Sequence, residues 1–165
     1  MGVGKPHESY HGQSINLSYS VRVTVLKSYS SNIVSEQEVL VYKVVEEPDF
    51  NTHMKLEAGL PDLVQVEIEY LKQKLFLSDW VVGKVWFTLV RVPIRSMELT
   101  IIRREYWNGE LLAPENLGTV ELMDGAPCRG DFIPFRIYLR NFDVTPTFTN
   151  VNRLFTVKYY LWLKI

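Results

Sequence analysis

The stretch LVQVEIEY at residues 63–70 decides the fold class of this chain. Its apolar side chains fall on every second residue, at Val64, Val66, Ile68 and Tyr70, and polar side chains lie between them. Successive side chains of a β-strand point to opposite faces of the sheet, so this alternation predicts a strand with one buried and one wet face. The β-branched residues at the apolar positions favour a strand over a helix.

Similar runs follow along the rest of the chain and are separated by turn-forming residues. Glycine and proline fall between the runs at 59–61, 108–109, 125–127 and 145–146. Many short strands with turns between them predict an all-β sandwich of the immunoglobulin type. We expect its strands within residues 53–58, 63–70, 74–77, 81–92, 95–107, 118–124, 132–139 and 154–165.

The N-terminal part of the chain predicts a long hairpin ahead of this sandwich. SINLSYSVRVTVLK at 14–27 alternates over its whole length and predicts one long strand with one buried face. KSYSSN at 27–32 indicates a loop, and EQEVLVYKVVEE at 36–47 a partner strand. PDFNTH at 48–53 is rich in turn formers, so we expect a domain boundary there.

The composition is that of a globular protein without a strong charge. Hydrophobic residues make up 47% of the 165 residues, and the formal net charge is −1. A nucleic-acid partner would usually leave a basic footprint, so none is expected. No apolar run approaches the roughly 20 residues that span a bilayer, so we expect no direct membrane insertion. Cys128 is the only cysteine, which excludes an internal disulfide and fits a cytoplasmic protein.

The pattern H-E-x-x-H, from His7 to His11, is the sequence motif of zinc proteases. It works on a helix, where both imidazoles share one face and a third ligand completes the site. Here Pro6 precedes the motif, Gly12 follows it, and the only other histidine, His53, lies in a loop-like stretch. We therefore expect a solvated approach segment and no metal. A zinc hydrolase built on this motif is the competing hypothesis from another functional class.

No other motif indicates catalysis. Arg129, Gly130 and Asp131 spell the integrin-binding tripeptide, but that function needs an extracellular loop, and Gly130 suits a turn between two strands. No Ser/His/Asp set or pair of acids stands out, and we expect no cofactor. The chain is rich in tryptophan and tyrosine, which are enriched in protein interfaces as well as in cores. The pattern alone therefore indicates a protein-binding sandwich and not an enzyme.

Four stretches together resemble one known family. They are ESYHG at 8–12, the run at 63–105, VELMDGAPCRGDFIPFRIYL at 120–139 and DVTPTFTNVNRLFTVKYYLWL at 143–163. MDGAP, the strand with Ile-Pro after it, and D-x-T-P-T followed by V-N form a specific combination. The chain resembles, over residues 8–165, the vacuolar protein sorting twenty-six family, a subunit of retromer with an arrestin-like fold.

The resemblance implies two tandem sandwiches, of which this chain would carry the C-terminal portion. Alternation continues up to Ile165, which agrees with a piece of a longer chain. A hairpin without its own sheet would expose an apolar face, so we expect a homodimer or strand swap through residues 14–45. The expected organisation is an added leader at 1–7, the closing hairpin of the N-terminal sandwich at 8–45, a linker at 46–51, and the C-terminal sandwich at 52–165 without its last strand or strands.

In the family, the second sandwich binds the α-solenoid subunit of retromer. The matching loop here holds Leu122, Met123, Asp124 and Gly125. Two apolar side chains before a glycine turn can serve as an anchor in a groove, the usual form of a binding hot spot. The residues alone favour the alternative in which Leu122 and Met123 end a strand and cap the core. The resemblance reverses that preference.

Sorting nexins and cargo tails meet the family near the junction of its two sandwiches. MKLEAG at 54–59 matches an edge strand there, to which an extended peptide can add, with Leu56 and Ala58 at the matched contact positions. Ala58 replaces a larger β-branched residue, so we expect weak cargo binding. The resemblance implies a non-enzymatic scaffold for retrieving cargo to the Golgi or plasma membrane, located in the cytoplasm, peripherally on endosomal membranes. An arrestin-like adaptor acting outside retromer is the alternative.

Overall fold

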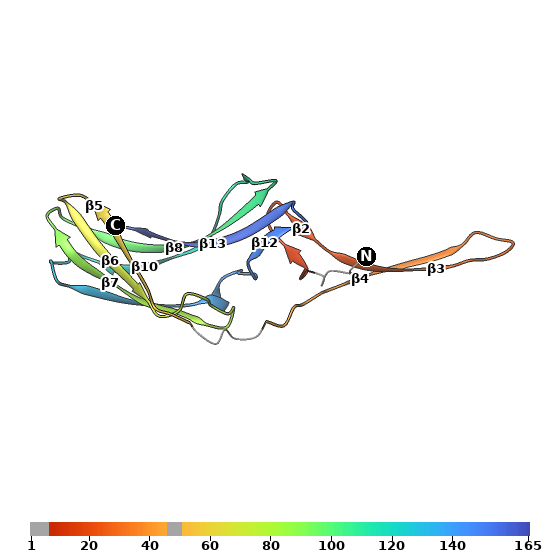
Figure 1. The fold of residues 1–165 in the computed structure, drawn as a ribbon, viewed down its shortest axis with the longest axis horizontal. Coiled ribbons are helices and arrows are strands. Elements are labelled where there is room, and N and C mark those ends of the chain that lie inside the picture. The colour runs from red at the N-terminus through yellow and green to blue at the C-terminus, as the bar shows by residue number, and fades with distance from the viewer. Residues whose placement is uncertain (1–6, 46–50) are drawn as a thin grey trace.

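The computed structural model describes residues 7–45 and 51–165, and strands dominate both segments (Figure 1). Two antiparallel sheets pack together as a sandwich, which confirms the expected all-β, arrestin-like fold. One sheet has the order β11-β7-β6-β5, and the other has the order β10-β8-β13-β12, with β9 also paired to β8. The strands are β5 (Met54–Leu60), β6 (Val64–Tyr70), β7 (Trp80–Val90), β8 (Ser96–Trp107), β9 (Glu110–Leu111), β10 (Glu115–Asp124), β11 (Phe132–Tyr138), β12 (Phe148–Val151) and β13 (Phe155–Lys164).

The main core lies between the two sheets and follows the period-two pattern of the sequence. Val64 and Val66 of β6 point inward, as expected from the opening stretch, and β7 adds Val85 and Phe87, which have no exposed surface. Burying one such side chain contributes about 1.5–3 kcal/mol. The facing sheet supplies Met97, Leu99 and Ile101 from β8.

A second, smaller core joins the N-terminal segment to the end of the sandwich. Here β1 (Tyr10–His11) pairs with β2 (Asn16–Leu17), and the Tyr10 ring lies 5.1 Å from that of Phe148. Only 1% of the Tyr10 surface is exposed. The full set of buried side chains in this cluster is Tyr10, Ile15, Phe148, Val151, Phe155 and Val157. Residues 10–17 therefore belong to the folded unit formed with β12 and β13.

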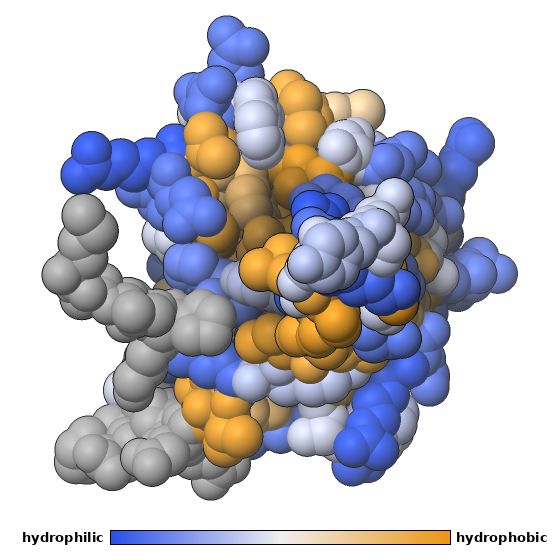
Figure 2. All heavy atoms as spheres, turned by 90° about the vertical axis from the view of Figure 1, so that its right-hand side faces the viewer, coloured by the Kyte–Doolittle hydropathy of each residue, from blue (hydrophilic) through white to orange (hydrophobic). Residues whose placement is uncertain are grey.

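The hairpin of β3 (Tyr19–Val25) and β4 (Ile33–Val39) extends away from the sandwich as a two-stranded arm (Figure 1). One face carries Val21, Val23, Val25 and Ile33, and each of these is more than half exposed. The opposite face is polar, with Arg22 and Glu36 paired at 2.7 Å among its residues. Hydrophobic residues accordingly gather near the centre of the view onto this end of the molecule (Figure 2).

The structure corrects the expected hairpin strands. The single strand expected over 14–27 breaks at Ser18, because the chain changes partner there, from β1 to β4. No residue of β3 is buried, so the buried face that the alternation predicted is absent in this structure. The partner strand expected over 36–47 spans Ile33–Val39 instead. Beyond this strand the chain runs beside Ser9. The Val41 N–H donates a hydrogen bond to Ser9 Oγ, and the Val41 carbonyl accepts one from the Ser9 N–H.

Within the sandwich, one expected strand is absent from the structure, and two strands of the structure were not expected from the sequence. Residues 74–77 form a loop that two side chains hold: Asn51 Oδ1 accepts hydrogen bonds from the N–H groups of Gln73 and Lys74, and Asp79 Oδ2 accepts one from the N–H of Phe76. The short strands β9 and β12 have too few residues to show a period. The expected leader at 1–7 and linker at 46–51 lie mostly outside the described residues.

Candidate functional site

The expected solenoid-binding residues lie together where β10 ends. Leu122 and Met123 are half-buried and pack against the main core, and a register shift between Glu121 and Met123 marks a β-bulge at this point. Asp124 and Gly125 are exposed. The loop residue Gly125 has a φ of +141°, and a side chain there would meet only open space. The apolar pair therefore contacts the core from a rim position, while the turn after it faces solvent.

A hollow of about 430 Å³ opens beside this turn. Hydrogen bonds within the loop that bounds it, and from that loop to β7, hold its shape. The Cys128 N–H donates to Asp131 Oδ2 at 2.8 Å, the Asp131 N–H donates to the Cys128 carbonyl, and the Gly130 N–H donates to the Phe87 carbonyl. The lining residues are Met123, Asp124, Gly125, Ala126, Pro127, Gly130, Asp131, Phe132 and Ile133. The turn expected at 129–131 is present, and it forms one wall of this concave surface.

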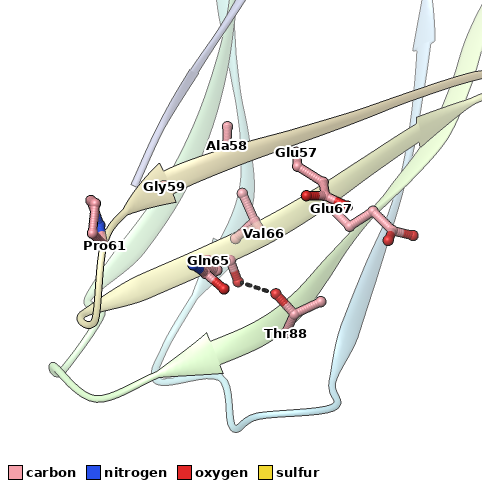
Figure 3. Close-up of a pocket in the computed structure, with 8 residues that line it drawn as sticks. All are labelled: Glu57, Ala58, Gly59, Pro61, Gln65, Val66, Glu67 and Thr88. Atoms are coloured by element: carbon pink, nitrogen blue, oxygen red, sulfur yellow. Dashed lines mark hydrogen bonds between the residues drawn. The ribbon is translucent and has the colours of Figure 1, made fainter.

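The expected edge-strand residues, Leu56 and Ala58, lie on β5 at the end of its sheet. They point to the same side as Ile68 and Val66 of β6, toward the interior of the sandwich. Leu56 is nevertheless 55% exposed, since the opposing sheet does not cover this strand. Ala58 also lines a second hollow of about 430 Å³, which lies across β5, β6 and β7 (Figure 3).

The zinc-protease motif does not adopt the conformation that metal binding needs. His11 belongs to the strand β1, and His7 lies in an irregular segment before it. In an extended chain, residues four apart are separated by about 13 Å at roughly 3.3 Å per residue, so the two imidazoles are not brought together as they are on one turn of a helix. In residues 7–45 and 51–165, no group of three or more His, Cys, Asp or Glu side chains is placed to hold a metal ion.

The middle of this motif instead joins a buried polar contact that the sequence analysis missed. The Tyr10 hydroxyl donates a short hydrogen bond to Glu105 Oε1, and the Ser14 N–H donates to Glu105 Oε2 at 2.8 Å. Burial, together with the Glu105 carboxylate, raises the pKa of Tyr10 far above its usual value of 10.0. Gly12 is required here, because a Cβ at this position would collide with Glu105 Oε1 and the Tyr10 hydroxyl.

A buried ion pair lies next along β8. The Arg103 guanidinium, whose side chain is 3% exposed, donates to Glu115 Oε2 at 2.6 and 2.9 Å and to the Asp143 carbonyl at 3.3 Å. Burial is the largest single influence and works against its charge, but Glu115, Tyr159 and Tyr10 together outweigh that effect and raise the pKa of Arg103. The sequence signal for this contact was the alternation of β8, which places Arg103 and Glu105 on the same inward face as Leu99 and Ile101.

The whole chain matches one protein family. The family model for Vps26, vacuolar protein sorting-associated protein 26, covers residues 1–165. This chain belongs to the Vps26 family. The family resemblance drawn from the sequence is therefore confirmed. Across residues 7–45 and 51–165, the structure contains no helix with the length and hydropathy of a membrane span.

Curated Vps26 relatives from distant organisms are similar over nearly all of this chain. Vacuolar protein sorting-associated protein 26 of Dictyostelium discoideum is 42% identical over 99% of the chain and 48% of its own length. The protein of the same name from Plasmodium falciparum is 44% identical over 99% of the chain and 56% of its own length. Human vacuolar protein sorting-associated protein 26B is 41% identical over 96% of the chain and 48% of its own length. The chain spans about half the length of these relatives.

Proposed function

We propose that this chain is part of a non-enzymatic scaffold subunit of retromer that binds the α-solenoid subunit. The observation that carries the proposal is the exposed turn at Asp124 and Gly125 beside a hollow, in a chain that the Vps26 family model covers from end to end. The proposal places the protein in the cytoplasm, peripherally on endosomal membranes, where cargo is retrieved toward the Golgi or the plasma membrane.

The geometry around β10 supports a protein contact of moderate size. Met123 lies at the rim of the hollow, and Phe132, 54% exposed, contributes apolar surface to its lining. Hot spots of protein interfaces are typically apolar anchors in or beside such concavities, surrounded by polar residues that exclude water. Asp124 and Asp131 supply that polar surrounding. Because Leu122 and Met123 are only half-buried, an approaching solenoid helix can still contact them.

The free edge of β5 supports a second contact, with sorting nexins and cargo tails. Leu56 offers an exposed apolar side chain beside unpaired backbone groups, which is the arrangement that added strands use. The small side chain of Ala58 leaves little to hold a cargo residue, so this contact is weak in this chain. We also propose that residues 8–45 are the closing hairpin of a preceding sandwich, whose sheet would cover the apolar face of β3 and β4.

A pull-down with the purified α-solenoid subunit tests the proposal. The wild-type chain is expected to be retained, and a variant with Leu122→Asp and Met123→Asn is expected to be lost from the bound fraction. Both side chains touch the core, so circular dichroism must show that this variant keeps its strands. Retention of a folded double variant would contradict the assigned surface. Failure of the wild-type chain to bind would favour the adaptor that acts outside retromer.

A further inference from the structure

The β5 edge differs from the opposite edge of the same sheet in its capacity to accept another strand. Strand β11, at the other end, has Pro134 in its middle, which lacks an N–H and so protects that edge. Among residues 7–45 and 51–165, strand β5 pairs with β6 alone, and it contains no proline between Met54 and Leu60. Its outward N–H and carbonyl groups can therefore bond to an added strand along the whole edge.

The charges on the outer face of this edge are unbalanced. Glu57 of β5 lies directly opposite Glu67 of β6, and like charges in that position repel. Lys55 pairs with Glu67 at 2.7 Å and with Glu69 at 3.8 Å, while Lys84 pairs with Glu69 at 2.9 Å. Three carboxylates thus face two ammonium groups, and of these three Glu57 is the one that makes no ion pair with the described residues. A cation on the free side of Glu57 would restore the balance.

The hollow beside Glu57 provides space for a long side chain. Figure 3 shows that Glu57 and Glu67 lie together at one end of it, while Gln65 and Thr88 lie further along. Gly59 places no side chain over the hollow, and a Cβ at Gly59 would collide with the Val64 carbonyl oxygen. The lining offers carboxylate, amide and hydroxyl oxygens, which are hydrogen-bond acceptors for an arginine or lysine side chain.

The inner face of β5 is apolar and favours apolar residues in an added strand. Leu56 and Leu60 are 55% and 62% exposed, although both point toward the side of the core. Side chains of an added strand alternate between the two faces, so the neighbours of a residue opposite Glu57 would lie over Leu56 and Ala58. Apolar residues at those two positions would cover the exposed surface of Leu56.

We propose that the β5 edge selects an extended peptide segment with arginine or lysine opposite Glu57 and an apolar residue on each side of it. This selectivity rests on the proposed function, in which β5 takes an added strand. The open edge provides the backbone contacts, the two glutamates and the hollow select the cation, and the apolar inner face at Leu56 and Ala58 selects its neighbours. A segment with glutamate at the central position is rejected.

Fluorescence anisotropy with labelled synthetic peptides tests this selectivity on the whole 165-residue chain. Three seven-residue peptides carry leucine at positions three and five, threonine elsewhere, and arginine, glutamine or glutamate at position four. We expect the arginine peptide to bind about three- to tenfold more tightly than the glutamate peptide, because exposed opposite-charge pairs attract modestly and like pairs repel by similar amounts. The difference should shrink as salt is raised.

Two variants separate the charge selection from the strand addition. Glu57→Gln should bring the arginine and glutamate peptides close to equal affinity and leave the glutamine peptide unchanged. Glu121→Gln, an exposed position on β10 of the other sheet, should alter none of the three affinities. Suppose that the wild-type chain binds all three peptides equally, and that methylation of the peptide backbone nitrogens abolishes this binding. This result would overturn the charge selection but not the strand addition. No binding by any peptide would overturn both the selection and the strand addition on which it rests.

Discussion

The buried contact between Tyr10 and Glu105 predicts a measurable loss of stability when a single oxygen atom is removed. Tyr10→Phe deletes the hydroxyl that donates to Glu105 Oε1. The ring stays in place, because its packing against Phe148 and Phe155, at centroid distances of 5.1 and 6.0 Å, does not involve the hydroxyl. Glu105, 2% exposed, is then left with the Ser14 N–H as its remaining hydrogen-bond donor in the described residues.

The magnitude follows from the burial and charge of the acceptor. A hydrogen bond to a charged group contributes about 1.5–3 kcal/mol to stability, and water does not replace the hydroxyl freely at a site this buried. For a chain of this length, 1 kcal/mol corresponds to about 2–4 °C in Tm. We therefore expect Tyr10→Phe to lower the free energy of unfolding by about 1.5–3 kcal/mol and Tm by about 3–12 °C.

Urea denaturation followed by tryptophan fluorescence measures this difference. Tyr160→Phe is the matched control, since it removes a hydroxyl that lies on the exposed side of β13, 3.4 Å from that of Tyr106. The control should change the free energy of unfolding by less than about 0.5 kcal/mol. Amide exchange at Ser14 should also speed up in Tyr10→Phe, because the loosened carboxylate is its acceptor. Equal stability of Tyr10→Phe and wild type would refute the structural role assigned to this contact.

Two further predictions concern the hairpin of β3 and β4. Its exposed apolar face should drive the chain into a dimer or strand swap, so the mass measured by light scattering should rise with protein concentration. The variant Val23→Lys should be a monomer. A monomeric wild-type chain at high concentration would contradict this prediction. The hydrogen bond from Ser20 and the contact with Arg22 hold the pKa of Glu36 below its usual 4.5. Their contribution to stability is therefore full above about pH 4.5 and is lost as the pH falls through the folded-state pKa. Ser20→Ala should raise the pKa of Glu36 in an NMR titration, and an unchanged value would exclude the bond.

Most strands of the sandwich were predictable because their alternating runs are long enough to show the two-residue period. Val64 and Val66 face inward as the alternation of LVQVEIEY requires, and the same holds for Met97 and Leu99 of β8. Residues 74–77 were assigned to a strand because the apolar run carries no information about Asn51 and Asp79, the side chains that bond to the backbone of this loop. Strands of two to four residues cannot display a period at all.

The places of the proposed site residues in the fold could be expected from the family resemblance, but their surroundings could not. The turn at Gly125 and the edge strand with Leu56 are present, yet the hollow beside each depends on how nearby residues fold back on one another, 123–133 beside the turn and 57–67 with Thr88 beside β5. Arg103 and Glu105 stand at inward positions of an alternating strand, which signals a buried polar contact. Their partners Tyr10 and Glu115 follow only from how the segments pack.

Titration of the α-solenoid subunit with the wild-type chain and with Asp124→Lys tests the central claim most directly. Asp124 is exposed, so its replacement reverses a charge at the turn without disturbing the core. Glu121→Lys, on the same strand and also exposed, is the control. Calorimetry should show binding by wild type and Glu121→Lys and at least a tenfold weaker affinity for Asp124→Lys. Equal affinity of all three proteins, or no binding by the wild-type chain, would contradict the claim that the turn after β10 is the solenoid-binding surface.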